Sequence, residues 1–323
     1  MSQAVESRTL KAKLFKLIGW IISALSIWYI YRVFQTMEHK INFGNDLTLF
    51  IKFSLFWCFM YALGFLGLGY VYRVILFYTS RNQVAIPLSP LLDIYTKANL
   101  SKYVPGNVLE FALRNFMGQS LGLNHKQIAM GSFFEMALSG LTGLLFSLLF
   151  CYDQFSSLIS QRFLDISITA IALASFLGLA LTLFFVIYIL KNLKDYLSFS
   201  LVKMIFKTQF LYSFIYLNLG LILVFTFSTI FGQDMGFKQA ALVVSALNLA
   251  WVAGFVVPGA PGGLGVKEAV LVMILSPTFG AELTVSAAII HRLISVVGDL
   301  LTYLLGRPSV TQFYVTAPSE RAS

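Results

Sequence analysis

Long apolar runs alternate along this chain with short polar connections that carry most of the charged residues. A helix needs about 20 apolar residues to cross a bilayer core of about 30 Å. Six runs reach that length, at 14–34, 47–78, 128–150, 166–190, 211–231 and 283–305, and two shorter apolar stretches lie at 240–257 and 266–275. The pattern predicts an all-α polytopic membrane protein with about six to eight membrane helices.

The composition excludes several other classes of protein. Of the 323 residues, 58% are hydrophobic and 11% are charged, whereas soluble domains carry about 25% charged residues. The 31 Phe and 15 Tyr residues argue against a disordered chain. The net charge is +9, but the basic residues are scattered singly between apolar runs, so we expect no nucleic-acid partner.

Cysteine and histidine residues form no recognisable site. The two cysteines, Cys58 and Cys151, lie within or at the end of apolar runs, and the three histidines are far apart in the sequence. Neither a disulfide framework nor a metal-binding motif is indicated. We therefore expect no metal and no other cofactor.

Lysine and arginine residues are distributed unevenly among the connections. Fourteen lie in the N-terminal tail, in 73–126 and in 191–207, whereas five lie in the alternate connections. Because cytoplasmic connections carry the excess of basic residues, we expect the first group to be cytoplasmic. The predicted organisation is a cytoplasmic tail at 1–13, a single transmembrane domain at 14–306 and a second cytoplasmic tail at 307–323.

Two Pro-Gly segments interrupt the apolar sequence in a similar way. In each, an apolar arm leads to a Pro-Gly break, a short helix with a basic residue, a turn and a full span. The first break is at Pro105 and Gly106, and the second begins at Pro258 and Gly259. We predict an inverted repeat, 14–150 and 166–306, whose halves each hold three spans and one broken re-entrant hairpin.

The function of such breaks depends on where they lie. Broken helices mark the binding site in many transporters, and non-helical backbone at membrane depth is tolerated only within protein or beside a wet cavity. The alternative is that each break is a helix kink or an ordinary loop.

Charged residues occur where an apolar environment is expected. Arg114 lies on the first short helix and Glu135 in the span after it, while Glu268 and Arg292 occupy the same parts of the second half. Intramembrane charges usually face partners or water, so we expect two ion pairs with exchanged signs. These pairs could fix the hairpins, bind a substrate, or do both, because paired charges can open to receive a charged headgroup. For Asp299 the sequence leaves two roles open, pairing across helices or capping a cavity.

Two strings of residues resemble a known family. Lys102-Tyr103-Val104-Pro105-Gly106, followed by Arg114 and Glu135, is similar to the first half of the lysylphosphatidylglycerol synthase transmembrane-region family. Pro261-Gly262-Gly263-Leu264-Gly265-Val266-Lys267-Glu268, followed by His291 and Arg292, is similar to its second half. Met136, Lys267 and His291 stand where the family commonly has arginine, arginine and tyrosine. The resemblance covers about residues 14–306.

The resemblance implies an integral protein of the inner or plasma membrane. In multidomain relatives the membrane part moves aminoacylated phosphatidylglycerol between leaflets, and a separate cytosolic domain attaches the amino acid. Because this chain ends about 18 residues after its last span, we expect no such enzymatic domain. We expect instead a flippase-like or scramblase-like transporter of a phospholipid, aminoacyl-lipid or glycolipid.

The expected substrate site combines the two breaks with nearby charges. Its residues are Lys102, Tyr103, Pro105, Gly106, Arg114, Glu135, Pro258, Gly259, Gly262, Gly263, Gly265, Lys267, Glu268 and Arg292. Helix N-termini after the breaks present N–H groups to a phosphate. Two alternatives are a non-catalytic accessory subunit for a glycosyltransferase or lipid-modifying enzyme, and an enzyme acting on a polyprenyl-linked substrate.

Overall fold

The computed structural model describes residues 47–81, 84–103, 109–150, 199–256 and 261–307, and this part of the chain is all-helical. The predicted spans at 14–34 and 166–190 lie outside the described residues. The α-helices are α2 (Leu47–Thr79), α3 (Leu88–Leu100), α4 (Leu109–Gly118), α5 (His125–Phe150), α8 (Phe199–Phe225), α9 (Phe237–Val256), α10 (Val266–Phe279) and α11 (Ala281–Leu305). Short helical turns lie at η1 (Ser101–Tyr103), η2 (Gln119–Leu121), η4 (Thr226–Ile230) and η5 (Pro261–Gly263).

Five of the described helices are long and apolar enough to cross a membrane, namely α2, α5, α8 with η4, α9 and α11. The fold class predicted from the sequence, an all-α polytopic membrane protein, is therefore confirmed. The 20 residues of α9 give the stretch at 240–257 the length of a span, which the sequence alone left open. By contrast, α10 has 14 residues and is shorter than the bilayer core requires.

Two predicted boundaries were wrong. The span predicted at 211–231 belongs to a helix that begins at Phe199, because α8 continues through residues assigned to a polar connection. In this first part of α8, Met204 and Thr208 are buried while Lys203 and Lys207 are exposed. The short apolar stretch expected at 266–275 also continues further as a helix. Helix α10 includes Pro277 near its end and stops only at Gly280, whose N–H bonds to the Ser276 carbonyl at 2.8 Å.

The two halves of the described chain contain the same sequence of elements. Helices α2, α3, α4 and α5 of the first half correspond in order to α8, α9, α10 and α11 of the second. Contacts between helices are also matched in the two halves. Helix α2 packs against α11, and its counterpart α8 packs against α5, the counterpart of α11. Likewise α5 packs against α9, and α11 packs against α3. This correspondence indicates that the halves pack alike. The inversion of the repeat relative to a membrane stays a prediction.

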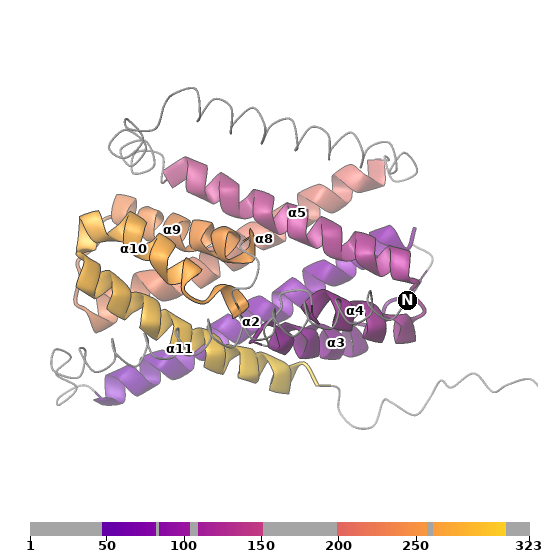
Figure 1. The fold of residues 1–323 in the computed structure, drawn as a ribbon, viewed down its shortest axis with the longest axis horizontal. Coiled ribbons are helices and arrows are strands. Elements are labelled where there is room, and N and C mark those ends of the chain that lie inside the picture. Colours follow the sequence, from indigo (N-terminus) through magenta and orange to yellow (C-terminus); the bar gives the residue numbers. More distant parts are fainter. Residues whose placement is uncertain (1–46, 82–83, 104–108, 151–198, 257–260, 308–323) are drawn as a thin grey trace, which may run out of the picture.

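Each half contains a hairpin, α3–α4 in the first and α9–α10 in the second. Figure 1 shows the outer ends of these hairpins at opposite ends of the helix bundle and their tips near its middle. The tips meet, because η1 contacts η5. Gly262 lies so near Lys102 that an added Cβ atom would be 3.8 Å from Lys102 Cγ.

Glycines in α2 allow this helix to approach its neighbours closely. An added Cβ atom on Gly67 would lie 3.1 Å from Ile215 Cδ1 in α8, and one on Gly69 would lie 2.5 Å from Leu92 Cδ2 in α3. Small residues at helix crossings are typical of membrane bundles. In this way α2 packs tightly against both the first hairpin and the second half of the chain.

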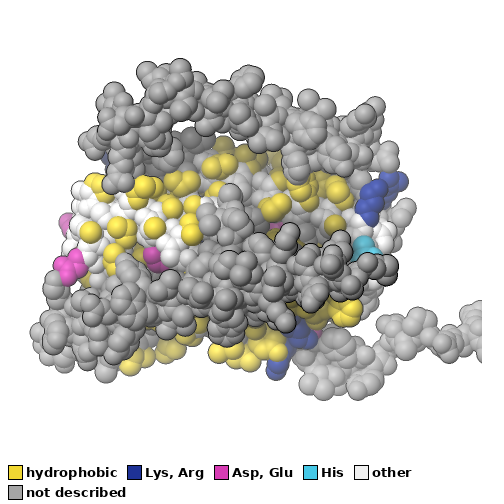
Figure 2. Space-filling model, in the orientation of Figure 1, with side chains coloured by type: hydrophobic (Ala, Val, Ile, Leu, Met, Phe, Trp, Pro, Cys, Tyr) yellow, Lys and Arg dark blue, Asp and Glu magenta, His cyan; other side chains and the backbone are white. Residues whose placement is uncertain are grey.

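The outer surface is apolar. Figure 2 shows hydrophobic side chains over much of the visible described surface. Among the exposed ones are Phe206, Phe210 and Phe214, which follow each other along α8 and are each at least 69% exposed. Such a surface suits lipid rather than water, and together with the five apolar helices it identifies an integral membrane protein.

Candidate functional site

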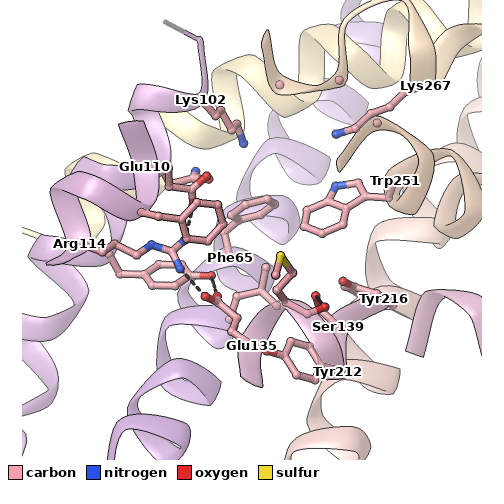
Figure 3. A pocket seen from close by; sticks show the side chains of 18 residues that line it. Phe65, Lys102, Glu110, Arg114, Glu135, Ser139, Tyr212, Tyr216, Trp251 and Lys267 are labelled. Atoms are coloured by element: carbon pink, nitrogen blue, oxygen red, sulfur yellow. Dashed lines mark hydrogen bonds and ion pairs between the residues drawn. The ribbon is translucent and has the colours of Figure 1, made fainter. Parts of the chain in front are cut away.

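A cavity lined by apolar and charged side chains lies between the two hairpins, in the middle of the apolar bundle. Water-sized molecules can occupy about 100 Å³ of it, and the empty space is about 860 Å³ when the open region at its mouth is counted. Its walls come from α2, α3, η1, α4, α5, α8, α9, η5 and α10. Figure 3 shows Arg114, Glu110 and Glu135 on one side, Lys267 and Trp251 on the other, and Lys102 between them.

Arg114 is the centre of the first charged cluster. Its side chain is 4% exposed and forms ion pairs with Glu135 of α5 and with Glu110 one turn earlier on α4. The Tyr95 hydroxyl donates a hydrogen bond to the Glu135 carboxylate at 2.7 Å, and the Arg114 guanidinium carbon lies 4.1 Å from the centre of the Tyr95 ring. Two carboxylates therefore share one guanidinium, which gives this cluster a surplus negative charge when all three groups are ionised.

The second predicted ion pair lies in the other half. Arg292 of α11 is 3.4 Å from the carboxylate of Glu268 on α10, and the same guanidinium nitrogen is 3.4 Å from the Gly262 carbonyl oxygen. The other oxygen of Glu268 accepts the Gly265 N–H at 2.8 Å, which closes the first turn of α10. Both ion pairs predicted from the sequence, with their exchanged signs, are confirmed.

Asp299 joins the two halves. Its carboxylate lies 2.8 Å from the Lys102 ammonium and accepts a hydrogen bond from Asn99 at 2.8 Å and one from the Tyr103 hydroxyl. The Tyr61 hydroxyl donates a fourth bond, at 3.4 Å. Of the two roles that the sequence left open for Asp299, the structure supports pairing across helices, from α11 to the tip of the first hairpin.

The side chain of Lys267 runs over two glycines. A Cβ atom on Gly254 would lie 2.8 Å from Lys267 Cγ, and one on Gly263 would lie 2.6 Å from Lys267 Cε. The ammonium group lies 5.2 Å from the centre of the Trp251 ring. No carboxylate of the described residues forms an ion pair with Lys267, in contrast to Lys102, Arg114 and Arg292.

A second cavity adjoins the first. Its lining includes Tyr103, Glu268, His291 and Arg292, and it shares five residues with the first cavity. The shared residues are Lys102, Tyr216, Trp251, Gly262 and Lys267. These side chains and the Gly262 backbone therefore form a common wall.

Most of the predicted site residues meet around these two cavities. Six line the first, namely Lys102, Arg114, Glu135, Gly262, Gly263 and Lys267, and Tyr103, Glu268 and Arg292 line only the second. Gly265 lines neither, although its N–H holds Glu268. Pro105, Gly106, Pro258 and Gly259 lie outside the described residues.

A protein-family model matches most of the chain. Residues 16–302 match the model of the family described as the lysylphosphatidylglycerol synthase TM region. The chain belongs to this family. None of the curated proteins matches the chain, and no solved structure does. Membership suggests a role connected with membrane lipids. The two segments that carried the family resemblance in the sequence both contribute residues to the lining of the paired cavities, Lys102, Arg114 and Glu135 from the first and Gly262, Lys267 and Arg292 from the second.

Several residues that line the cavities were not predicted from the sequence of this family member. Tyr95 and Asn99 line the first cavity from α3, and Tyr212, Tyr216 and Trp251 line it from α8 and α9. One signal was present: Asp93, Thr96 and Asn99 put a polar stripe on α3 that is buried in the structure. The Tyr212 hydroxyl is buried beside the cavity and has no hydrogen-bond partner among the described residues.

Proposed function

We propose that this protein moves a membrane lipid between the two leaflets, with the polar headgroup inside the paired cavities and the acyl chains in the bilayer. The observation that carries the proposal is the convergence of Arg114, Lys267 and Glu135 from both halves on one cavity in an apolar bundle. A charge at the bilayer centre costs about 2.5–3.5 kcal/mol on insertion scales. Such residues are rarely kept at membrane depth without a role.

The ion pairs suit a site that must bind and release a charged group. While the cavity is empty, Glu135 and Glu268 neutralise Arg114 and Arg292, so no guanidinium is left unpaired in a poorly solvated place. A headgroup that enters can exchange its own charges for one of these partners. The common wall between the cavities lies between the two hairpin tips, where a headgroup would pass from one cavity to the other.

The accessory-subunit alternative and the transporter proposal predict different behaviour of the purified protein in the absence of a partner enzyme. A subunit that only holds a glycosyltransferase or lipid-modifying enzyme would leave lipid translocation unchanged in vesicles without that enzyme. We propose a transporter rather than an enzyme, in the inner or plasma membrane with both termini in the cytoplasm.

The test is translocation of lipids labelled on an acyl chain, read by dithionite quenching in reconstituted vesicles. We expect the wild type to exceed protein-free vesicles, and the Arg114→Gln/Arg292→Gln variant to lose most of that excess. Arg114→Gln/Glu135→Gln and Glu268→Gln/Arg292→Gln, which remove whole pairs, serve if the first variant fails to fold. Translocation at the wild-type rate in all folded variants would overturn the proposal.

A further inference from the structure

The charges around the first cavity are not all of one sign. At one end, Glu110 and Glu135 share the single guanidinium of Arg114, so the cluster carries one surplus negative charge when all three groups are ionised. The carboxylates are partly accessible, with 17% and 12% of their side chains exposed. This end of the cavity is therefore able to accept hydrogen bonds from a cation.

The other end carries the opposite surplus when the Lys267 amine is protonated. Asp299 neutralises Lys102, and Glu268 neutralises Arg292. Lys267 has the Trp251 ring beside it but no carboxylate within ion-pair distance among the described residues. Gly254 and Gly263 leave room for its stem, so the ammonium group reaches the cavity lining. Figure 3 shows Lys267 and the Arg114 cluster on opposite sides of the cavity.

From this separation of charge we infer that the lipid carries a zwitterionic headgroup with one phosphate and one ammonium group; the inference rests on the proposed function. The phosphate accepts hydrogen bonds from Lys267, and the ammonium donates to the carboxylates of Glu110 and Glu135. Both surplus charges are then neutralised in a place where an unpaired charge is costly.

Lipids of other charge fit this arrangement less well. A purely anionic headgroup leaves the surplus at Glu110 and Glu135 unmatched and brings a further negative charge into the cavity. A headgroup with two ammonium groups and one phosphate has one ammonium group more than the surplus charges can pair. That extra positive charge would stay unmatched in the cavity. One phosphate and one ammonium satisfy both ends.

The decisive comparison uses the wild-type protein in vesicles of phosphatidylglycerol. Three probes are added in trace amounts, each labelled on an acyl chain: phosphatidylethanolamine, phosphatidylglycerol and N-acetyl-phosphatidylethanolamine. The N-acetyl lipid keeps the phosphate but lacks the ammonium group. Because hydrogen bonds to charged groups contribute about 1.5–3 kcal/mol, we expect phosphatidylethanolamine to move about tenfold faster than either anionic probe.

Two variants assign the ends of the headgroup. Glu110→Gln removes the surplus carboxylate and should slow phosphatidylethanolamine about tenfold while leaving the N-acetyl lipid unchanged or faster. Lys267→Gln should slow all three probes, because each contains the phosphate. Asp234→Asn and Lys238→Gln are matched controls, since both residues are exposed and line neither cavity.

The outcomes separate the two proposals. If no probe moves faster than in protein-free vesicles, the proposed function fails. If phosphatidylglycerol moves as fast as phosphatidylethanolamine, lipid translocation stands and the zwitterionic headgroup is overturned. Equal slowing of all probes by Glu110→Gln would also overturn the assignment of the ammonium. The wild-type comparison needs no variant and decides the question if one fails to fold.

Discussion

The ammonium group of Lys102, at the tip of the first hairpin, lies 2.8 Å from the carboxylate of Asp299 in the last helix. The Asp299 side chain is fully buried, and Asn99 and Tyr103 supply two of its other hydrogen bonds. This contact ties the hairpin of one half to α11 of the other, beside the wall that the two cavities share.

The Lys102–Asp299 contact should contribute to stability in a way that depends on both partners. Asp299→Asn leaves the ammonium without its counter-charge, and losing one partner of a buried pair costs about 3–5 kcal/mol. We expect a clearly lower melting temperature in detergent, with a smaller loss for Lys102→Met/Asp299→Asn than the two single variants add up to. Strictly additive losses would mean that the two groups do not interact.

The Glu268–Arg292 pair should tolerate an exchange of its residues. Glu268→Arg and Arg292→Glu, made singly, place two like charges close together and should reduce both folded yield and translocation. The double variant restores opposite charges at the same two positions, so partial recovery of both is expected. Thermal unfolding and the vesicle assay provide the readouts. A double variant no better than either single one would speak against a direct pairing.

Gly263 should be needed both for its positive φ and for the space that it leaves for the Lys267 side chain. Gly263 has φ +73° and Gly265 has φ +79°, a region that disfavours residues with a Cβ atom. A methyl group at 263 also collides with the Lys267 stem, whereas nothing lies within 4 Å of one at 265. Both Ala variants should lose about 1–2 kcal/mol of stability because of the positive φ, and Gly263→Ala should lose more because of the collision. Only Gly263→Ala should strongly reduce translocation, because it displaces Lys267; equal rates would contradict this role.

Opposite exposure of the hairpin ends would establish the inverted topology. Ser120, after α4, and Asp234, before α9, are both exposed. In a background without Cys58 and Cys151, we expect a cysteine at 120 to react from the cytoplasmic side and one at 234 from the opposite side. Labelling of intact cells with an impermeant maleimide, before and after permeabilisation, measures this. Reaction of both cysteines from one side would overturn the inversion.

The sequence predicted local features well. Each charged pair joins a short helix to the span that follows it, so the turn between them already brings Arg114 near Glu135 and Glu268 near Arg292. The spans and short helices in the described residues also follow from apolar length and from Pro and Gly. The position of Pro277 inside α10 was not predicted, because Pro277 was expected to end the helix. A proline near the end of a helix removes only one hydrogen bond, so the helix continues past it.

Contacts between the two halves could not be predicted from the sequence. Asp299 and Lys102 are far apart in the chain, and no local spacing relates them. Tyr212, Tyr216 and Trp251 lie in helices that are apolar on nearly every side, where composition does not tell a cavity-facing aromatic residue from a lipid-facing one. Packing of α8 and α9 against the two hairpins decides which way they point.

The wall common to the two cavities has a consequence for stoichiometry. Because Lys102 and Lys267 line both spaces, a phosphate bound on one side of the wall uses positive charge that a second phosphate on the other side would need. Two headgroups would also repel each other across a single layer of side chains. The proposed transport should therefore advance one lipid per cycle, with a rate that saturates with a Hill coefficient no greater than one.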